Sequence, residues 1–177
     1  MNQEIVSEQL AALHKDAFGW ALHCCRGDAA RAEEVLQDAY VKWLQGRLHY
    51  GGTGSVKAWW LEVIRLTALE EWRRHRRGWN LIERVRDWFS DDATDEPEDR
   101  RPHPARQADL DDESLRLRKL LALLPARQAE VLHLVFYENL TIKESAAVMH
   151  VGLGSARTHY ERGKRRLREW LEQEGIE

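Results

Sequence analysis

A dense group of basic side chains lies near the carboxyl end of the 177-residue sequence. Residues 155–168 contain six arginines and lysines and a single acid, Glu161. Arginine binds guanine edges and phosphates, hydroxyl groups reach bases or phosphates, and glutamate can accept a hydrogen bond from cytosine. On a helix, the outward side chains of this stretch would therefore suit the major groove of duplex DNA. The predicted contacts are Ser155, Arg157, Thr158, Glu161, Arg162, Lys164 and Arg165.

The residues just before this basic stretch predict the elements that would position it. Thr141 and Glu144 have the spacing of a capping box, which predicts the start of a short helix. His150, Val151 and Gly152 break that helix, and a second helix is expected from Leu153 to about residue 173. A short capped helix, a tight turn and a basic helix together predict a helix-turn-helix. A charged, solvated terminal helix is the alternative, and the agreement of cap, turn and charge favours DNA binding.

Helical periodicity dominates the rest of the chain, so the expected fold class is all-α. Helices are predicted from Ser7 to Cys25, from an Asp28 cap to Leu44, and from a Ser55 cap to Arg77. Residues 46–55 contain four glycines and must form a loop. Two further helices are expected around 117–124 and from Pro125 to about 139. The apolar side chains predicted to face inward include Val35, Leu36, Ala39, Tyr40, Trp43, Leu44, Trp60, Val131, Leu132, Val135, Phe136, Leu153, Ala156, Tyr160 and Leu167.

Charge is segregated along the chain, although the net charge is only −3. Residues 1–64, 65–86, 87–113 and 114–177 carry −2, +4, −8 and +3. Residues 87–113 also contain three prolines and few apolar side chains, a composition typical of a segment that cannot form a core. The prediction is two small helical domains, 1–89 and 113–177, joined by a flexible acidic linker, 90–112.

Other classes of protein find little support in the sequence. No apolar run is long enough to span a membrane, and no secretory signal is evident, so we expect a cytoplasmic protein without membrane insertion. His23, Cys24 and Cys25 could form a metal or redox site, but adjacent helical residues point to different faces, and helix packing is the preferred interpretation. Neither a phosphate loop nor a nucleophile elbow is present, so we expect no catalytic centre, metal or cofactor.

Both halves of the chain, in this order, resemble one family. The stretches are 27–45, GDAARAEEVLQDAYVKWLQ; 55–77, SVKAWWLEVIRLTALEEWRRHRR; and 123–171, LLPARQAEVLHLVFYENLTIKESAAVMHVGLGSARTHYERGKRRLREWL. They are similar to an extracytoplasmic-function (ECF) RNA polymerase sigma factor of the sigma-70 family, the kind with regions 2 and 4 only. The resemblance runs over residues 10–77 and 120–171, about two thirds of the chain.

The resemblance implies a role for each part of the chain. The C-terminal helix-turn-helix would bind the −35 promoter element, and the N-terminal domain would capture the melted −10 element. Single-strand capture needs cations and aromatic platforms, here provided by Tyr50, Trp59, Arg65, Arg73, Arg74, Arg76 and Arg77. The resemblance adds Thr67, which stands near the position of the captured base. The clamp helices of the largest subunit of core RNA polymerase would contact Glu34, Gln37, Asp38 and Lys42. Control by an anti-sigma factor is also expected.

The sequence departs from the family pattern at several positions. Thr67 stands where Asn is usual, His150 replaces the common Gly of the turn, Gly152 replaces a capping Ser, and Ser145 an apolar residue. These departures put the −10 preference and the fine docking of the recognition helix in question. A stand-alone helix-turn-helix regulator, with an N-terminal domain that senses a ligand or dimerises, is the rival interpretation; it predicts tight duplex binding without polymerase.

Overall fold

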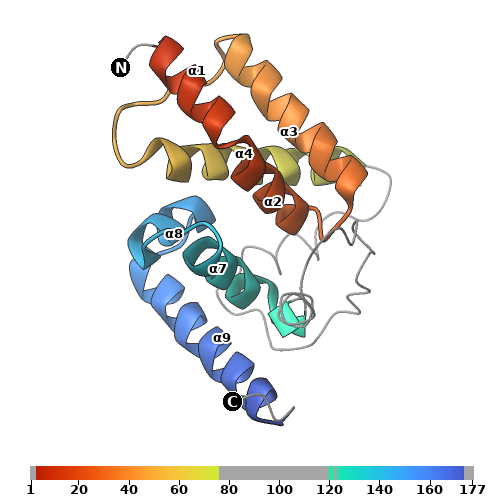
Figure 1. The fold of residues 1–177 in the computed structure, drawn as a ribbon, viewed down its shortest axis with the longest axis vertical. Coiled ribbons are helices and arrows are strands. Elements are labelled where there is room, and N and C mark those ends of the chain that lie inside the picture. The colour runs from red at the N-terminus through yellow and green to blue at the C-terminus, as the bar shows by residue number, and fades with distance from the viewer. Residues whose placement is uncertain (1–2, 76–119, 122, 174–177) are drawn as a thin grey trace. The chain divides into compact units, whose positions relative to one another are not determined.

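A computed structural model describes residues 3–75, 120–121 and 123–173, and within these ranges every regular element is a helix. The chain divides into two compact units, Met1–Leu81 and Ile82–Glu177. Figure 1 shows the helices of both units, which we describe separately. The expected all-α fold class is confirmed. The predicted domain boundaries and the linker 90–112 fall outside the described residues and stay predictions.

The N-terminal unit is built from four helices. They are α1 (Gln3–Ala12), α2 (His14–Cys24), α3 (Ala29–Leu44) and α4 (Val56–His75). Helices α2, α3 and α4 pack on one another, and α1 packs on α4. The single helix expected from Ser7 to Cys25 is therefore wrong, because the chain bends at Leu13 (φ −85°, ψ 2°) into two helices.

Local chemistry fixes where the helices of this unit begin and end. The Asp28 side chain accepts a hydrogen bond from the Arg31 amide at 3.1 Å, and the Ser55 hydroxyl accepts one from the Ala58 amide at 3.1 Å. Both predicted caps are confirmed. Gly46, with φ +68°, follows the end of α3 in the left-handed conformation that glycine adopts without strain.

Tryptophans form much of the core between these helices. Trp20 and Trp60 are fully buried, and the Trp20 indole donates a hydrogen bond to the Leu61 carbonyl at 2.9 Å. Trp43 is 5% exposed, lies edge-on against Trp59 at 5.6 Å between ring centroids, and donates to the Ser7 hydroxyl. This aromatic packing holds α3 against α4 at the end of the 46–55 loop.

The C-terminal unit, in its described residues, contains α7 (Ala126–Phe136), α8 (Ile142–Met149) and α9 (Leu153–Gln173). Each of these helices packs on the other two. Pro125 is the N-cap of α7, one position before the first turn where we expected it. Asn139, with φ +56°, turns the chain towards α8.

Periodicity predicted most of the core but placed three side chains wrongly. Leu44, Phe136 and Leu153 are 77%, 56% and 38% exposed, although each continues the apolar stripe of its helix. The first two end their helices, and Leu153 begins its helix, so no neighbouring turn is placed to cover them. In the described part of the chain no helix is long and apolar enough to cross a membrane.

Candidate nucleic-acid interface

The capping box and turn before α9 are formed as the sequence predicts. The Thr141 hydroxyl accepts a hydrogen bond from the Glu144 amide at 3.2 Å, and the Glu144 carboxylate accepts one from the Thr141 amide at 2.9 Å. The chain reverses at His150, which has a left-handed conformation with φ +55° and ψ +45°. This conformation is strained for a residue with a Cβ, whereas glycine adopts it freely. Two helices joined by this short turn form the helix-turn-helix.

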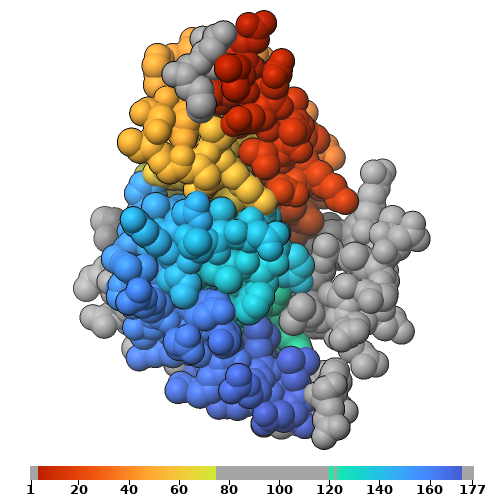
Figure 2. All heavy atoms as spheres, turned by 60° about the vertical axis from the view of Figure 1, so that its left-hand side comes forward, coloured from red at the N-terminus to blue at the C-terminus, as the bar shows by residue number. Residues whose placement is uncertain are grey.

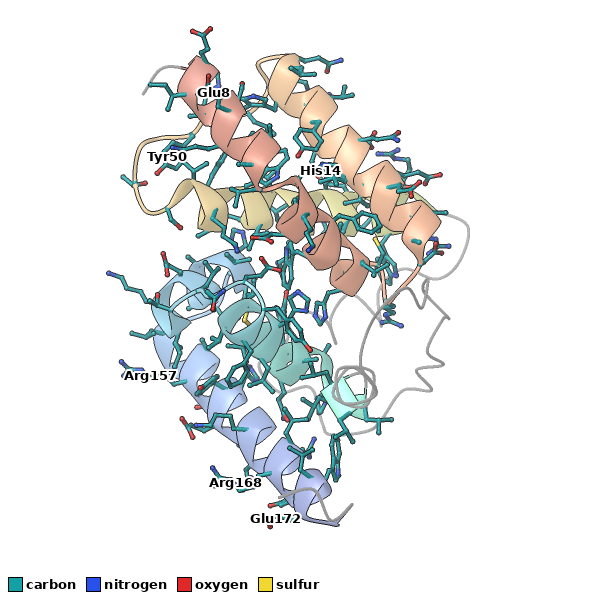
Figure 3. All side chains as sticks on the ribbon, in the orientation of Figure 1. Glu8, His14, Tyr50, Arg157, Arg168 and Glu172 are labelled. Carbon is teal, nitrogen blue, oxygen red and sulfur yellow. The ribbon has the colours of Figure 1, made fainter. Side chains whose placement is uncertain are left out.

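Helix α9 carries the predicted duplex-reading face on its exposed side. Arg157, Thr158, Glu161, Arg162 and Arg165 are exposed or half-buried, as are Ser155 and Lys164. Figure 3 labels Arg157 and Arg168, whose side chains extend outward from α9. In the space-filling view α8 and α9 form much of the visible face of this unit (Figure 2). The accessible side chains of this set are polar or basic, as phosphate and base contacts require.

Three of these side chains already have partners within the helix. The Thr158 hydroxyl donates to the Gly154 carbonyl at 3.0 Å, so towards DNA it can act only as an acceptor. Lys164 lies 5.1 Å from the centre of the Tyr160 ring, and Arg165 makes a loose ion pair with Glu169 at 3.9 Å. Within the described residues no ion pair engages Arg157 or Arg162, which leaves both guanidinium groups available for bidentate contacts.

Gly163 lets α9 approach α7 closely. A Cβ atom at this position would lie 2.8 Å from Leu132 Cδ1 and 3.3 Å from Gln128 Cβ. In contrast, a Cβ atom at Gly154 on the same helix would meet nothing within 4 Å. The glycine that lowers the helix propensity of α9 is therefore required by packing.

The N-terminal residues predicted to bind melted DNA divide into buried and accessible groups. Arg65 and Thr67 are each 2% exposed, because they face the helix interface rather than solvent. A direct DNA contact needs accessible atoms, so both are packing residues in this structure. Arg73 and Arg74 are exposed on α4, while Arg76 and Arg77 lie outside the described residues.

The two aromatic candidates lie together at the 46–55 loop. Tyr50 packs on Trp59 at 5.4 Å between ring centroids, and its hydroxyl donates to the Gly54 carbonyl. Trp59 also contacts Trp43 and Trp60, and both Tyr50 and Trp59 are half-buried. Each side chain therefore keeps some accessible surface beside a glycine-rich loop, where an unstacked base could bind.

Helix α3 presents the residues predicted to meet the polymerase, but only part of the set is free to do so. Glu34 and Gln37 are exposed. Asp38 lies 3.6 Å from Arg74 on α4, and Lys42 Nζ lies 2.6 Å from Glu70 and 3.0 Å from Thr67 Oγ1. Sequence reasoning missed Glu70, since nothing in its local pattern marks it. Asp38 and Lys42, predicted to contact the polymerase, are thus bonded to Arg74 and Thr67, predicted to contact DNA.

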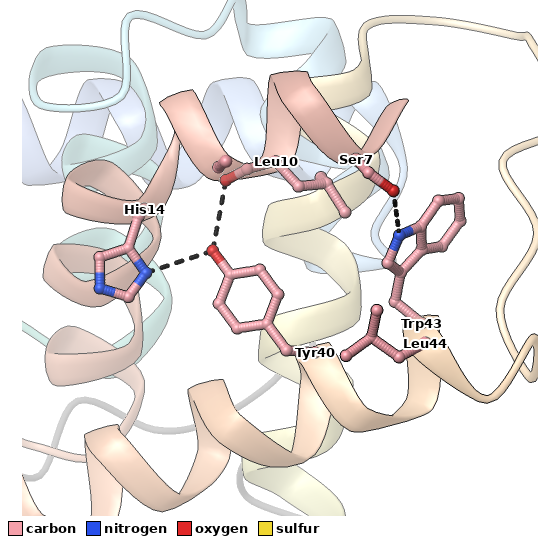
Figure 4. A pocket seen from close by; sticks show the side chains of 7 residues that line it. Ser7, Leu10, His14, Tyr40, Trp43 and Leu44 are labelled. Atoms are coloured by element: carbon pink, nitrogen blue, oxygen red, sulfur yellow. Dashed lines mark hydrogen bonds between the residues drawn. The ribbon is translucent and has the colours of Figure 1, made fainter. Parts of the chain in front are cut away.

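A hollow of about 360 Å³ opens between α1, α2 and α3 (Figure 4). In its lining, His14 Nδ1 lies 3.2 Å from the Tyr40 hydroxyl oxygen. The Tyr40 hydroxyl donates its hydrogen bond to the Leu10 carbonyl at 3.2 Å. Burial raises the pKa of Tyr40. Neither composition nor spacing predicted this hollow, because its walls come from separate helices.

The residues His23, Cys24 and Cys25 pack as helix residues. The His23 ring stacks on Trp20 at 5.2 Å between centroids, and both cysteines are free thiols. Burial, and then the Asp28 carboxylate, raise the pKa of the Cys25 thiol to about 11. Among the described residues no cluster of three or more His, Cys, Asp or Glu could hold a metal ion.

Comparisons with known proteins place both units in one family. The model of sigma-70 region 2 matches residues 10–78, and the model of sigma-70 region 4 matches residues 114–167. The chain is 24% identical over 162 residues to the ECF RNA polymerase sigma factor SigX of Bacillus subtilis (strain 168), covering 90% of this chain and 79% of that protein. Its fold is similar to that of the sigma factor RpoE in complex with the anti-sigma factor NepR from Bartonella quintana. That match has a TM-score of 0.65 and 22% identity, and covers 94% of this chain and 96% of the other. The chain therefore belongs to the sigma-70 family of RNA polymerase sigma factors, of the ECF type, with region 2 in its N-terminal unit and region 4 in its C-terminal unit.

Proposed function

We propose that this sigma factor holds a promoter at two points while bound to core RNA polymerase. The single observation that carries the proposal is the exposed basic face of α9, which follows a complete capping box and a tight turn. A helix of this kind enters the major groove with its N-terminal residues at base edges. Arg157 and Arg162 would read bases of the −35 element, and Lys164, Arg165 and Arg168 would bind phosphates.

The N-terminal unit would hold the melted −10 strand. Trp59 and Tyr50 supply stacking surfaces beside the 46–55 loop, and Arg73 and Arg74 supply exposed cations on α4. Stacking and charge together capture single strands without requiring a duplex. Arg65 and Thr67 would stabilise this surface by packing inside the unit, since both are buried.

Docking on the polymerase would use the exposed part of α3. Glu34 and Gln37 are accessible and suit a basic partner, whereas Lys42 is held against α4. We infer that the protein acts in the cytoplasm, where RNA polymerase acts, and contributes binding rather than chemistry. The solved relative RpoE is bound to the anti-sigma factor NepR, which supports the proposal that this chain too is controlled by an anti-sigma factor.

In vitro transcription with core polymerase tests the proposal. The wild-type chain should direct one specific start, and Arg157→Ala or Arg162→Ala should cost about 1–3 kcal/mol of promoter binding, with altered preference at single −35 positions. Arg168→Ala is the matched control, since it lies further along the same helix and should weaken binding equally for all sequences. Failure of the wild-type chain to bind core polymerase would overturn the proposal.

A further inference from the structure

Lys42 and Glu70 form an ordered pair between α3 and α4. The ammonium group lies 2.6 Å from Glu70 Oε2 and donates a second hydrogen bond to Thr67 Oγ1 at 3.0 Å. The Lys42 side chain is only 18% exposed, and Thr67 is 2% exposed. Most surface ion pairs fluctuate because both partners are mobile. Here the buried threonine fixes the lysine, and the lysine fixes the carboxylate.

The pair presents one hydrogen-bonding group outward. The Glu70 side chain is 56% exposed, so its carboxylate can accept a further hydrogen bond while it stays bound to Lys42. The lysine charge offsets the carboxylate charge, which lowers the electrostatic cost of bringing a DNA strand near. A carboxylate only accepts, and the exocyclic amino groups of cytosine, adenine and guanine donate. Thymine has no amino group, and its one ring donor, N3–H, lies between two carbonyl oxygens that a carboxylate repels.

Two arginines lie close to this acceptor on α4. Glu70 and Glu71 precede Arg73 and Arg74 on α4, and Arg74 lies 3.2 Å from Glu71 and 3.6 Å from Asp38. The Arg74 guanidinium is 60% exposed and can bind a backbone phosphate on its outer side. A base whose phosphate meets Arg74 would lie within reach of a carboxylate one helical turn away.

We propose that Glu70 selects a base of the melted promoter strand by accepting a hydrogen bond from its exocyclic amino group, and that Lys42 positions Glu70. This assignment rests on the proposed role of the N-terminal unit in holding the melted strand. On this assignment, Lys42 contributes to DNA recognition and not to docking on the polymerase. It also makes Thr67 a support for the lysine instead of a base contact.

The test uses the full chain with core polymerase and promoters substituted at each −10 position. Wild type should discriminate against thymine at one position, and Glu70→Gln should reduce that discrimination about tenfold, because an amide can also donate to the thymine carbonyl. Lys42→Met should reduce it similarly, and Lys42→Arg should restore it by keeping a cation against Glu70. Glu34→Ala is the matched control on α3, expected to weaken core binding without changing base preference.

Two results would overturn the inference. One is a Glu70→Gln variant with wild-type preference at every −10 position; this exposed, nearly isosteric change should not disturb folding. The other is a Lys42→Met variant that loses affinity for core polymerase while it keeps its base preference. If the wild-type chain itself gives no specific transcript with core polymerase, the proposed function fails, and the inference falls with it.

Discussion

The two units position their binding residues in different ways. In the C-terminal unit, Arg157 and Arg162 lie on one exposed helix, and their availability follows from their place in the helical repeat. In the N-terminal unit, the Lys42–Glu70 and Asp38–Arg74 contacts each join α3 to α4. The first surface depends on one helix and its cap, and the second exists only while two helices stay packed. The N-terminal surface should therefore be far more sensitive to changes in the core.

The largest effect should come from removing the aromatic contact that holds α3 against α4. Trp43→Ala deletes a side chain that is 5% exposed, and such a deletion should cost about 3–5 kcal/mol of unfolding free energy. Leu44→Ala is the matched control, since this neighbouring side chain is 77% exposed and should change stability by under about 0.5 kcal/mol. Hydrogen exchange measured on the full chain should show loss of protection in the N-terminal unit only. Equal loss in α9 would contradict an effect of Trp43 confined to the N-terminal unit.

Gly163→Ala should give the next largest effect, confined to the C-terminal unit. The new methyl group would meet Leu132 Cδ1 at 2.8 Å, and overpacking of this kind costs about 1–3 kcal/mol. Gly154→Ala, where space is open, should instead stabilise α9 by up to about 1 kcal/mol. Chemical denaturation would measure the change in unfolding free energy for each variant, and hydrogen exchange would show whether it is confined to α7 and α9. Equal effects of the two substitutions would show that helix propensity, not packing, determines how alanine at these positions changes stability.

The contrast between the units also explains how much the sequence could predict. The helix starts at Asp28, Ser55 and Thr141 could be predicted, because a cap is a contact between residues three apart. The exposed face of α9 could be predicted for the same reason, since helical spacing alone determines it.

Features that depend on contacts between distant residues could not be predicted. The need for glycine at position 163 depends on Leu132 of α7, whose Cδ1 would lie 2.8 Å from a Cβ atom there. Residue type and family position predict DNA contacts for Arg65 and Thr67, but packing buries both side chains. Glu70 carried no signal at all, because its partner Lys42 lies 28 residues away.

The smallest effect concerns Cys25 and pH. Its folded-state pKa is about 11 against an ordinary value of 9.0, so the folded state holds the thiol proton more tightly than the unfolded state. The resulting stabilisation is fully present below pH 9 and is lost as the pH rises towards 11. In a Cys24→Ser chain, alkylation of Cys25 at pH 8 should be slowed about a hundredfold by folding, because only the thiolate reacts. Equal rates in the folded and the guanidinium-unfolded chain would contradict a half-buried thiol that stays protonated at this pH.

Promoter affinity measured with and without core polymerase tests the central claim most directly. If the two units form one grip that closes on the polymerase, the chain alone should bind duplex promoter DNA weakly and with little sequence preference. With core polymerase, binding should become tight and specific for a promoter that carries both elements. Tight, sequence-specific binding by the chain alone, unchanged by core polymerase, would contradict this account and identify a stand-alone regulator.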